Sequence, residues 1–83
     1  MLTINNTGEL TVGDIVLSIP NKHNIYKTGK NYSIRRFGVE SINYENNTVL
    51  LFDLDNYEHF HWNRNVDILK GYHSLIVVTN VYN

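Results

Sequence analysis

Cysteine, alanine and glutamine are absent from this sequence of 83 residues, and proline occurs once, as Pro20. Without cysteine the chain has neither a disulfide framework nor thiolate chemistry. Alanine is the best helix former, and its absence beside many valine, isoleucine, threonine and tyrosine residues favours strands. The length is that of one domain with a modest core. We therefore expect a single small all-β domain, residues 1–83, without disulfides.

Targeting and membrane signals are also missing. The first residues, MLTINN, have neither the basic nor the apolar part of a signal peptide, and no apolar run approaches the roughly 20 residues that span a bilayer. We expect a cytoplasmic protein without a membrane partner. Asparagine, isoleucine and tyrosine, which have AT-rich codons, are abundant. This bias indicates a low-GC genome, such as that of a bacteriophage or of a low-GC bacterium, and a phage-encoded protein would act in the host cytoplasm.

Motifs of common enzyme classes are lacking as well. The sequence contains no G-x-S-x-G nucleophile elbow, no phosphate-binding glycine loop and no H-E-x-x-H zinc motif. Asp53, Asp55 and Glu58 flank an expected hairpin, and this pattern is typical of a solvated turn, not of a catalytic carboxylate pair. We therefore predict a non-catalytic protein that has no cofactor.

Alternating apolar residues predict the strands. Residues 10–19 change parity at Gly13, and residues 32–39 change parity at Arg35 and Arg36, so each strand is expected to contain a bulge or a sharp bend. Further strands are expected at 49–54, 57–62 and 74–82, and a short helical turn with Asn65 as its N-cap at 65–71.

This order of elements resembles that of the SH3-like small barrels, the group that includes SH3, Tudor and KOW-type domains. The resemblance is carried by residues 11–16 (TVGDIV), 29–34 (GKNYSI) and the turn at 65–69 (NVDIL). It implies an all-β, five-stranded barrel with one helical or 3₁₀ turn before the last strand. An ALYDY-like segment is not found, so the resemblance does not extend to the proline-rich ligands of signalling SH3 domains. An up-and-down sheet is the alternative architecture.

The segment YEHFHW is rich in aromatic residues and histidine. In a strand, Tyr57, His59 and His61 share one face, and Phe60 and Trp62 share the other. Two imidazoles so placed can share a zinc ion, but a zinc site needs at least three protein ligands and no third stands at a diagnostic spacing. We therefore predict no metal site. Phe60 is expected in the core, whereas Trp62 is either a core residue or an anchor for a partner.

The outer row of this strand lies beside an acidic turn, and together they form a candidate surface for a protein partner. Its residues are Tyr57, His59, His61, Trp62, Asp53 and Asp55.

Positive charge is concentrated in one segment. Between Ile15 and Val39 the chain has five basic residues and no acidic residue. Basic groups interleaved with aromatic rings are typical of nucleic-acid contact. The candidate residues are Lys22, Lys27, Lys30, Arg35, Arg36, Tyr26 and Tyr32. The alternative is a solvated segment whose charges balance acids elsewhere in the fold.

The last strand is apolar on both faces over Leu75, Ile76, Val77 and Val78. Burial of both faces indicates a strand that is covered from outside. The cover is either a second copy of the chain, which predicts a homo-oligomer, or the N-terminal residues 2–4.

From these features we predict a non-catalytic interaction module that binds a protein partner. If the source is a phage, inhibition of a host enzyme or defence complex would be such a role. Nucleic-acid binding through the basic segment, and a homo-oligomeric structural role, are the alternatives.

Overall fold

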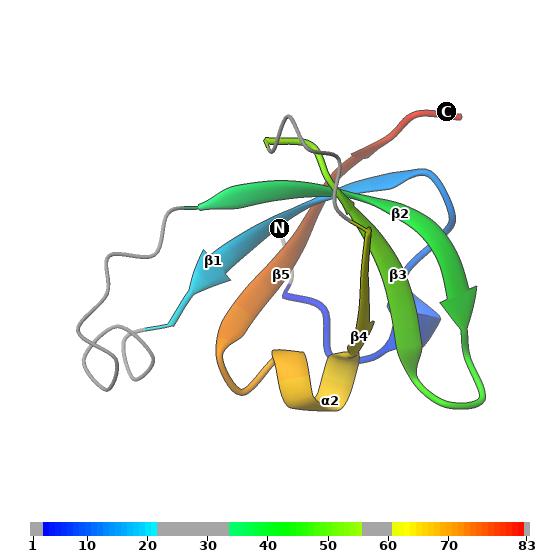
Figure 1. The fold of residues 1–83 in the computed structure, drawn as a ribbon, viewed down its shortest axis with the longest axis vertical. Coiled ribbons are helices and arrows are strands. Elements are labelled where there is room, and N and C mark those ends of the chain that lie inside the picture. Colours follow the sequence, from blue (N-terminus) through cyan, green and yellow to red (C-terminus); the bar gives the residue numbers. More distant parts are fainter. Residues whose placement is uncertain (1–2, 22–33, 56–60, 83) are drawn as a thin grey trace.

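The computed structural model describes residues 3–21, 34–55 and 61–82. Five antiparallel strands form one twisted sheet in the order β4-β3-β2-β1-β5 (Figure 1). This confirms the all-β prediction. No pairing joins β4 to β5 among the described residues, so the sheet is open and the predicted barrel is not shown. The elements are η1 (Thr7–Glu9), β1 (Asp14–Pro20), β2 (Arg35–Asn43), β3 (Thr48–Asp53), β4 (His61–Asn65), α2 (Val66–Leu69) and β5 (His73–Asn80).

The first strand is shorter than the sequence predicts. The 3₁₀ helix η1 precedes it, and β1 begins only at Asp14. The change of parity at Gly13 is a turn in which this residue has φ +92°, a left-handed conformation that glycine adopts without strain. The irregular register lies further on, where β1 pairs with β5 between Ile15 and Val16. The prediction of one long bulged strand is therefore wrong at this point.

The second strand also has its irregularity elsewhere. Arg35 and Arg36 pair in regular register with Ser18 and Leu17 of β1, so they lie on opposite faces of the sheet. The prediction of a bulge or sharp bend at these two residues is therefore wrong. The register shift lies between Val39 and Ser41, where Glu40 is the additional residue opposite β3.

The core lies on one face of the sheet. Among the described residues, eight apolar side chains are buried there, and partly buried ones, including Trp62, pack against them. The core therefore accounts for one of the two roles predicted for Trp62, while Phe60 lies outside the described residues. The buried members of the core are Ile4, Leu10, Val16, Val39, Val49, Leu51, Val66 and Leu75.

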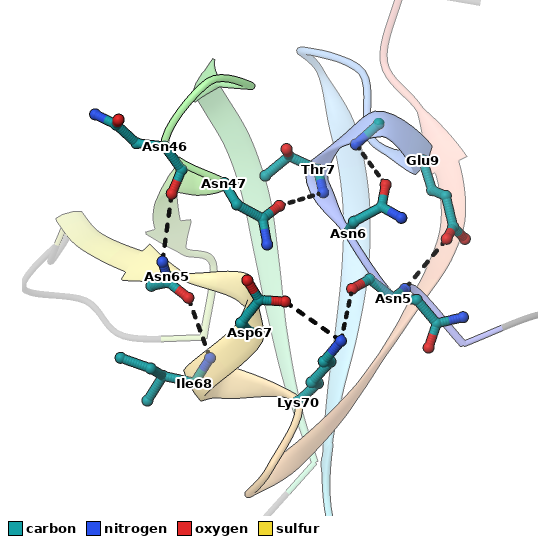
Figure 2. Close-up of polar contacts among 11 residues, drawn as sticks. Asn5, Asn6, Thr7, Glu9, Asn46, Asn47, Asn65, Asp67, Ile68 and Lys70 are labelled. Carbon is teal, nitrogen blue, oxygen red and sulfur yellow. Dashed lines mark hydrogen bonds and ion pairs between the residues drawn. The ribbon is translucent and has the colours of Figure 1, made fainter.

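Asparagine side chains connect the loops at one end of the sheet (Figure 2). Asn47 in the β2–β3 turn has φ +54°, which asparagine tolerates better than most residues. Its Oδ1 accepts a hydrogen bond from the Thr7 N–H at 2.9 Å, and its carbonyl accepts one from the Val66 N–H at 2.9 Å. One residue thus ties the turn to both η1 and α2.

The helix α2 is fixed in the same cluster. Asn65 caps it as predicted, because its Oδ1 accepts a hydrogen bond from the Ile68 N–H at 3.2 Å. Lys70 Nζ lies 3.3 Å from Asp67 Oδ1 and donates to the Asn5 carbonyl at 3.3 Å (Figure 2). Hydrogen bonds from the side chains of Asn47 and then Lys70 hold the pKa of Asp67 below its ordinary value.

The N-terminal segment pairs with the free edge of β5. Thr3 forms an isolated bridge with Ile76, and the Ile4 N–H donates to the Leu75 carbonyl at 2.7 Å. Residues 3 and 4 therefore cover part of this strand, as one of the two alternatives predicted. None of the helices among the described residues has the length and apolar character needed to cross a membrane.

Candidate protein-binding groove

The face of the sheet opposite the core is also largely apolar. In β1, Val16 is buried toward the core while Ile15 and Leu17 are partly exposed on the other face. In β3, Leu50 and Phe52 are partly exposed between buried residues. Antiparallel sheets commonly present polar side chains on the face away from the core, and this one presents aliphatic and aromatic groups instead. This outer face therefore offers surface for apolar contact.

A groove of about 350 Å³ lies on this outer face. Gly38 in β2 lines it, with Ile15 of β1 and Phe52 of β3 directly opposite in register. A Cβ atom on Gly38 would stand 3.9 Å from Ile15 Cδ1 and 4.0 Å from Leu54 Cδ2, which is ordinary contact. The missing side chain of Gly38 therefore leaves a hollow. The lining residues are Val12, Gly13, Ile15, Gly38, Val39, Glu40, Phe52, Val81 and Tyr82.

The C-terminal residues build one wall of the groove. The Val81 N–H donates to the Gly13 carbonyl at 3.0 Å, and the Gly13 N–H donates to the Val39 carbonyl at 2.9 Å. A Cβ atom on Gly13 would collide with the Tyr82 ring, so only glycine permits this close approach. Tyr82 is 78% exposed and Val81 62% exposed, and the wall is therefore open to solvent.

Asp14 fixes the turn behind that wall. Its buried carboxylate accepts hydrogen bonds from the Thr11 N–H at 2.7 Å and from Asn80 Nδ2 at 2.8 Å. Asn80 Oδ1 accepts from the Tyr82 N–H at 2.8 Å. This network positions residues 80–82 against the turn at residue 13, and it places the Asp14 charge in the interior and not in the groove.

Glu40 and His61 form the polar rim. Glu40 Oε2 lies 2.6 Å from His61 Nδ1, and the side chains are 35% and 52% exposed. The His61 ring also meets the edge of Phe52, with ring centroids 5.1 Å apart. Of the described residues that line the groove, Glu40 is the only one with a charge. The site thus combines an apolar hollow with one accessible carboxylate.

Two ion pairs join the start of β2 to the end of β3. Arg35 Nη1 lies 3.2 Å from Oδ2 of Asp53, which is fully buried. Arg36 Nη2 lies 2.9 Å from Asp55 Oδ1, and the Arg36 N–H donates to Asp55 Oδ2 at 2.7 Å. Both arginines are therefore paired with acids of the same chain. Asp53 has no exposed surface, so we leave it out of the surface for a partner.

The Arg36 contacts make the contribution of Asp55 to stability dependent on pH. The Arg36 side chain and then its N–H hold the pKa of Asp55 below its ordinary value of 3.8. Ionised Asp55 therefore stabilises the fold at neutral pH, and this contribution is lost as pH falls through the lowered pKa. We expect Asp55→Asn to be less stable than wild type by up to about 1 kcal/mol near pH 6, since the pair is at the surface. The two melting temperatures should converge over the pH range below the ordinary value of 3.8, as Asp55 becomes protonated. A difference that stays constant over this range would contradict the assignment.

The predicted site residues are distributed over different parts of the structure. His61 lies on the groove rim, whereas Trp62 packs on the core side with the Arg64 guanidinium 4.3 Å from its ring centroid. In β5, Leu75 is buried and Val78 is 49% exposed. Ile76 and Val77 are partly buried. The residues Tyr57, His59, Lys22, Lys27, Lys30, Tyr26 and Tyr32 lie outside the described residues.

Most of the groove was not among the sequence predictions. The predictions did not include Val12, Gly38, Glu40, Phe52, Val81 or Tyr82. One signal was available, because residues 15–19 and 49–54 are apolar at almost every position, just as β5 is. A strand that is apolar on both faces predicts a second contact surface. The wall made by residues 81 and 82 depends on the turn after β5 and had no comparable signal.

The described residues contain no group of three or more histidine, cysteine, aspartate or glutamate side chains that could hold a metal ion. Function is therefore inferred from the groove and its rim. Comparison of the chain with protein-family models, with curated proteins and with solved structures gives no match.

Proposed function

We propose that this protein is a non-catalytic interaction module whose groove binds a segment of a protein partner. The observation that carries this proposal is the apolar hollow over Gly38, bounded by Phe52 and by the exposed Tyr82. Small-molecule sites usually enclose most of their ligand. A groove with a solvent-exposed wall is better suited to a side chain whose backbone continues across the surface.

The composition of the groove also supports a protein partner. Aromatic residues such as Tyr82 are enriched among the residues that dominate the energy of protein interfaces. His61, one of the residues predicted for partner contact, touches the groove through Glu40 and Phe52. The exposed side of Asp55, predicted for the same surface, is available beside Arg36.

For the architecture, we propose an open relative of the SH3-like small barrels. Support comes from the strand order, in which β1 pairs with both β2 and β5, and from the short helix α2 between β4 and β5. This proposal concerns the fold and adds nothing to the choice of partner.

A displayed library of random peptides tests the function. We expect wild-type protein to enrich peptides that bind it, and Gly38→Leu to lose this binding at least tenfold because its side chain occupies the hollow. A Cβ atom at Gly38 makes only ordinary contacts, and circular dichroism and melting temperature check that the Gly38→Leu variant folds. Ser41→Leu is the matched control, since Ser41 is exposed on the same strand but does not line the groove.

Three results would overturn the proposal. The first is the absence of enriched peptides relative to an unrelated protein. The second is equal binding by wild type and Gly38→Leu. The third is a dimer, seen by light scattering at micromolar concentration, that Gly38→Leu disperses, because the occupant would then be a second copy of the chain.

A further inference from the structure

The charges around the groove restrict what can bind in it. Glu40 places a carboxylate at the rim, and the described residues that line the groove include no lysine or arginine. Arg36 lies on the same strand face as Gly38, and its guanidinium is paired with Asp55. The Asp14 carboxylate is buried and accepts hydrogen bonds from the Thr11 N–H and from Asn80 Nδ2. An occupant therefore meets an apolar hollow with negative charge at one side.

The Glu40 carboxylate has capacity for a further contact. Its Oε2 lies 2.6 Å from His61 Nδ1, and the Glu40 side chain remains 35% exposed. A carboxylate accepts as many as about four hydrogen bonds, so a ligand cation can be added without displacing His61. A guanidinium or ammonium group forms charge-assisted hydrogen bonds with such an acceptor. A phosphate group would be repelled, which argues against a nucleic acid or an anionic lipid surface at this site.

The spacing of the two features fits an extended peptide. Gly38 and Glu40 are two residues apart on β2 and both line the groove. In an extended chain, residues two positions apart point the same way and are separated by roughly 6.5–7 Å. A peptide that lies along the groove can therefore present one side chain to the hollow and the side chain two residues away to Glu40.

We infer that the groove takes a segment of a protein partner in which an apolar side chain fills the hollow over Gly38 and a lysine or arginine about two residues away pairs with Glu40. This inference rests on the proposed function and names its partner chemistry. It applies to either chain direction of the segment, because the groove and Glu40 specify the two side chains and not the backbone polarity.

A charge reversal tests this chemistry with the same displayed library. We expect peptides selected by wild type to carry lysine or arginine close to an apolar residue, and peptides selected by Glu40→Lys to carry aspartate or glutamate there. Glu45→Lys is the matched control: Glu45 lies in the exposed turn between β2 and β3, outside the groove, and the overall charge change is identical. This control should select the same basic peptides as wild type.

Affinity measurements complete the test. A fluorescein-labelled synthetic copy of one peptide selected by wild type should bind Glu40→Gln at least tenfold more weakly than wild type in fluorescence anisotropy. Its affinity for wild type should fall with added salt more steeply than its affinity for Glu40→Gln.

The possible failures are distinguishable. Peptides that need an open Gly38 hollow but have no basic preference, or that bind Glu40→Gln unchanged, would overturn the inference and leave the proposed function in place. If no peptide depends on the hollow, both fail together.

Discussion

Replacing Leu75 with alanine is expected to lower the free energy of unfolding by about 2–5 kcal/mol. Leu75 is only 2% exposed, and it belongs to the core cluster of the sheet. It lies where β5 is held on both sides, by Ser18 of β1 and by the Ile4 N–H that donates to the Leu75 carbonyl. Truncation would leave a cavity that these hydrogen-bonded neighbours cannot easily close. Small domains are stable by about 5–15 kcal/mol, so the loss is a large share of the total.

Urea denaturation measures this effect, and Val78→Ala provides the control on the same strand. Val78 is 49% exposed, so shortening it should cost less than about 0.5 kcal/mol, as is usual for surface substitutions. The slope of free energy against urea should stay the same in both variants if they unfold in two states. Equal losses at the two positions would show that β5 is covered on both faces.

The difference between these positions could not be predicted from the sequence, although the strand itself could. Leu75 and Val78 both stand in an unbroken apolar run, and alternation alone does not distinguish them. Burial is determined by the register shift opposite Ile15 and Val16 and by the pairing of Thr3 with Ile76. Both depend on contacts between segments that are far apart in the sequence.

Local signals were reliable where the structure is local. Asn65 and the short helix after it were predicted from capping chemistry, and Asn65 caps α2 through the Ile68 N–H. The change of parity at Gly13 correctly marked an interruption but not its nature, whereas the bulge or bend predicted at Arg35 is not found there. The interruption at Gly13 is a turn outside the strand. At Arg35 the strand β2 begins, and Arg35 and Arg36 pair in regular register with β1.

The groove could not be predicted from the sequence for a related reason. Its floor is a glycine, its rim residue Glu40 stands at a bulge, and its wall consists of residues beyond the last strand. None of these features has an apolar period that a sequence reading detects. By contrast, His61 was selected for its neighbours Tyr57 and His59, yet its contacts in the structure are Glu40 and Phe52, from two other strands.

Replacing Arg35 with methionine should cost about 2–3 kcal/mol of stability, because it leaves the Asp53 carboxylate buried without its cation. Asp53 is fully buried, and from the described residues it accepts, beyond the contact with Arg35 Nη1 at 3.2 Å, a hydrogen bond from the Asp55 N–H at 2.9 Å. Methionine retains the length of the apolar stem, so the change isolates the charge. Chemical denaturation at neutral pH measures the loss.

The adjacent Arg36→Met is the matched control, and it should cost at most about 1 kcal/mol. Its partner Asp55 is 34% exposed and returns to water when the guanidinium is removed. Adding Asp53→Asn to Arg35→Met should recover part of the stability, since the buried group is then neutral. Equal losses for the two arginines would contradict this account. If Arg35→Met loses more stability than Arg36→Met, weaker nucleic-acid binding by an Arg35 variant would reflect a destabilised fold and not a lost contact. The hypothesis that the basic segment binds nucleic acid would then be tested with Arg36→Met.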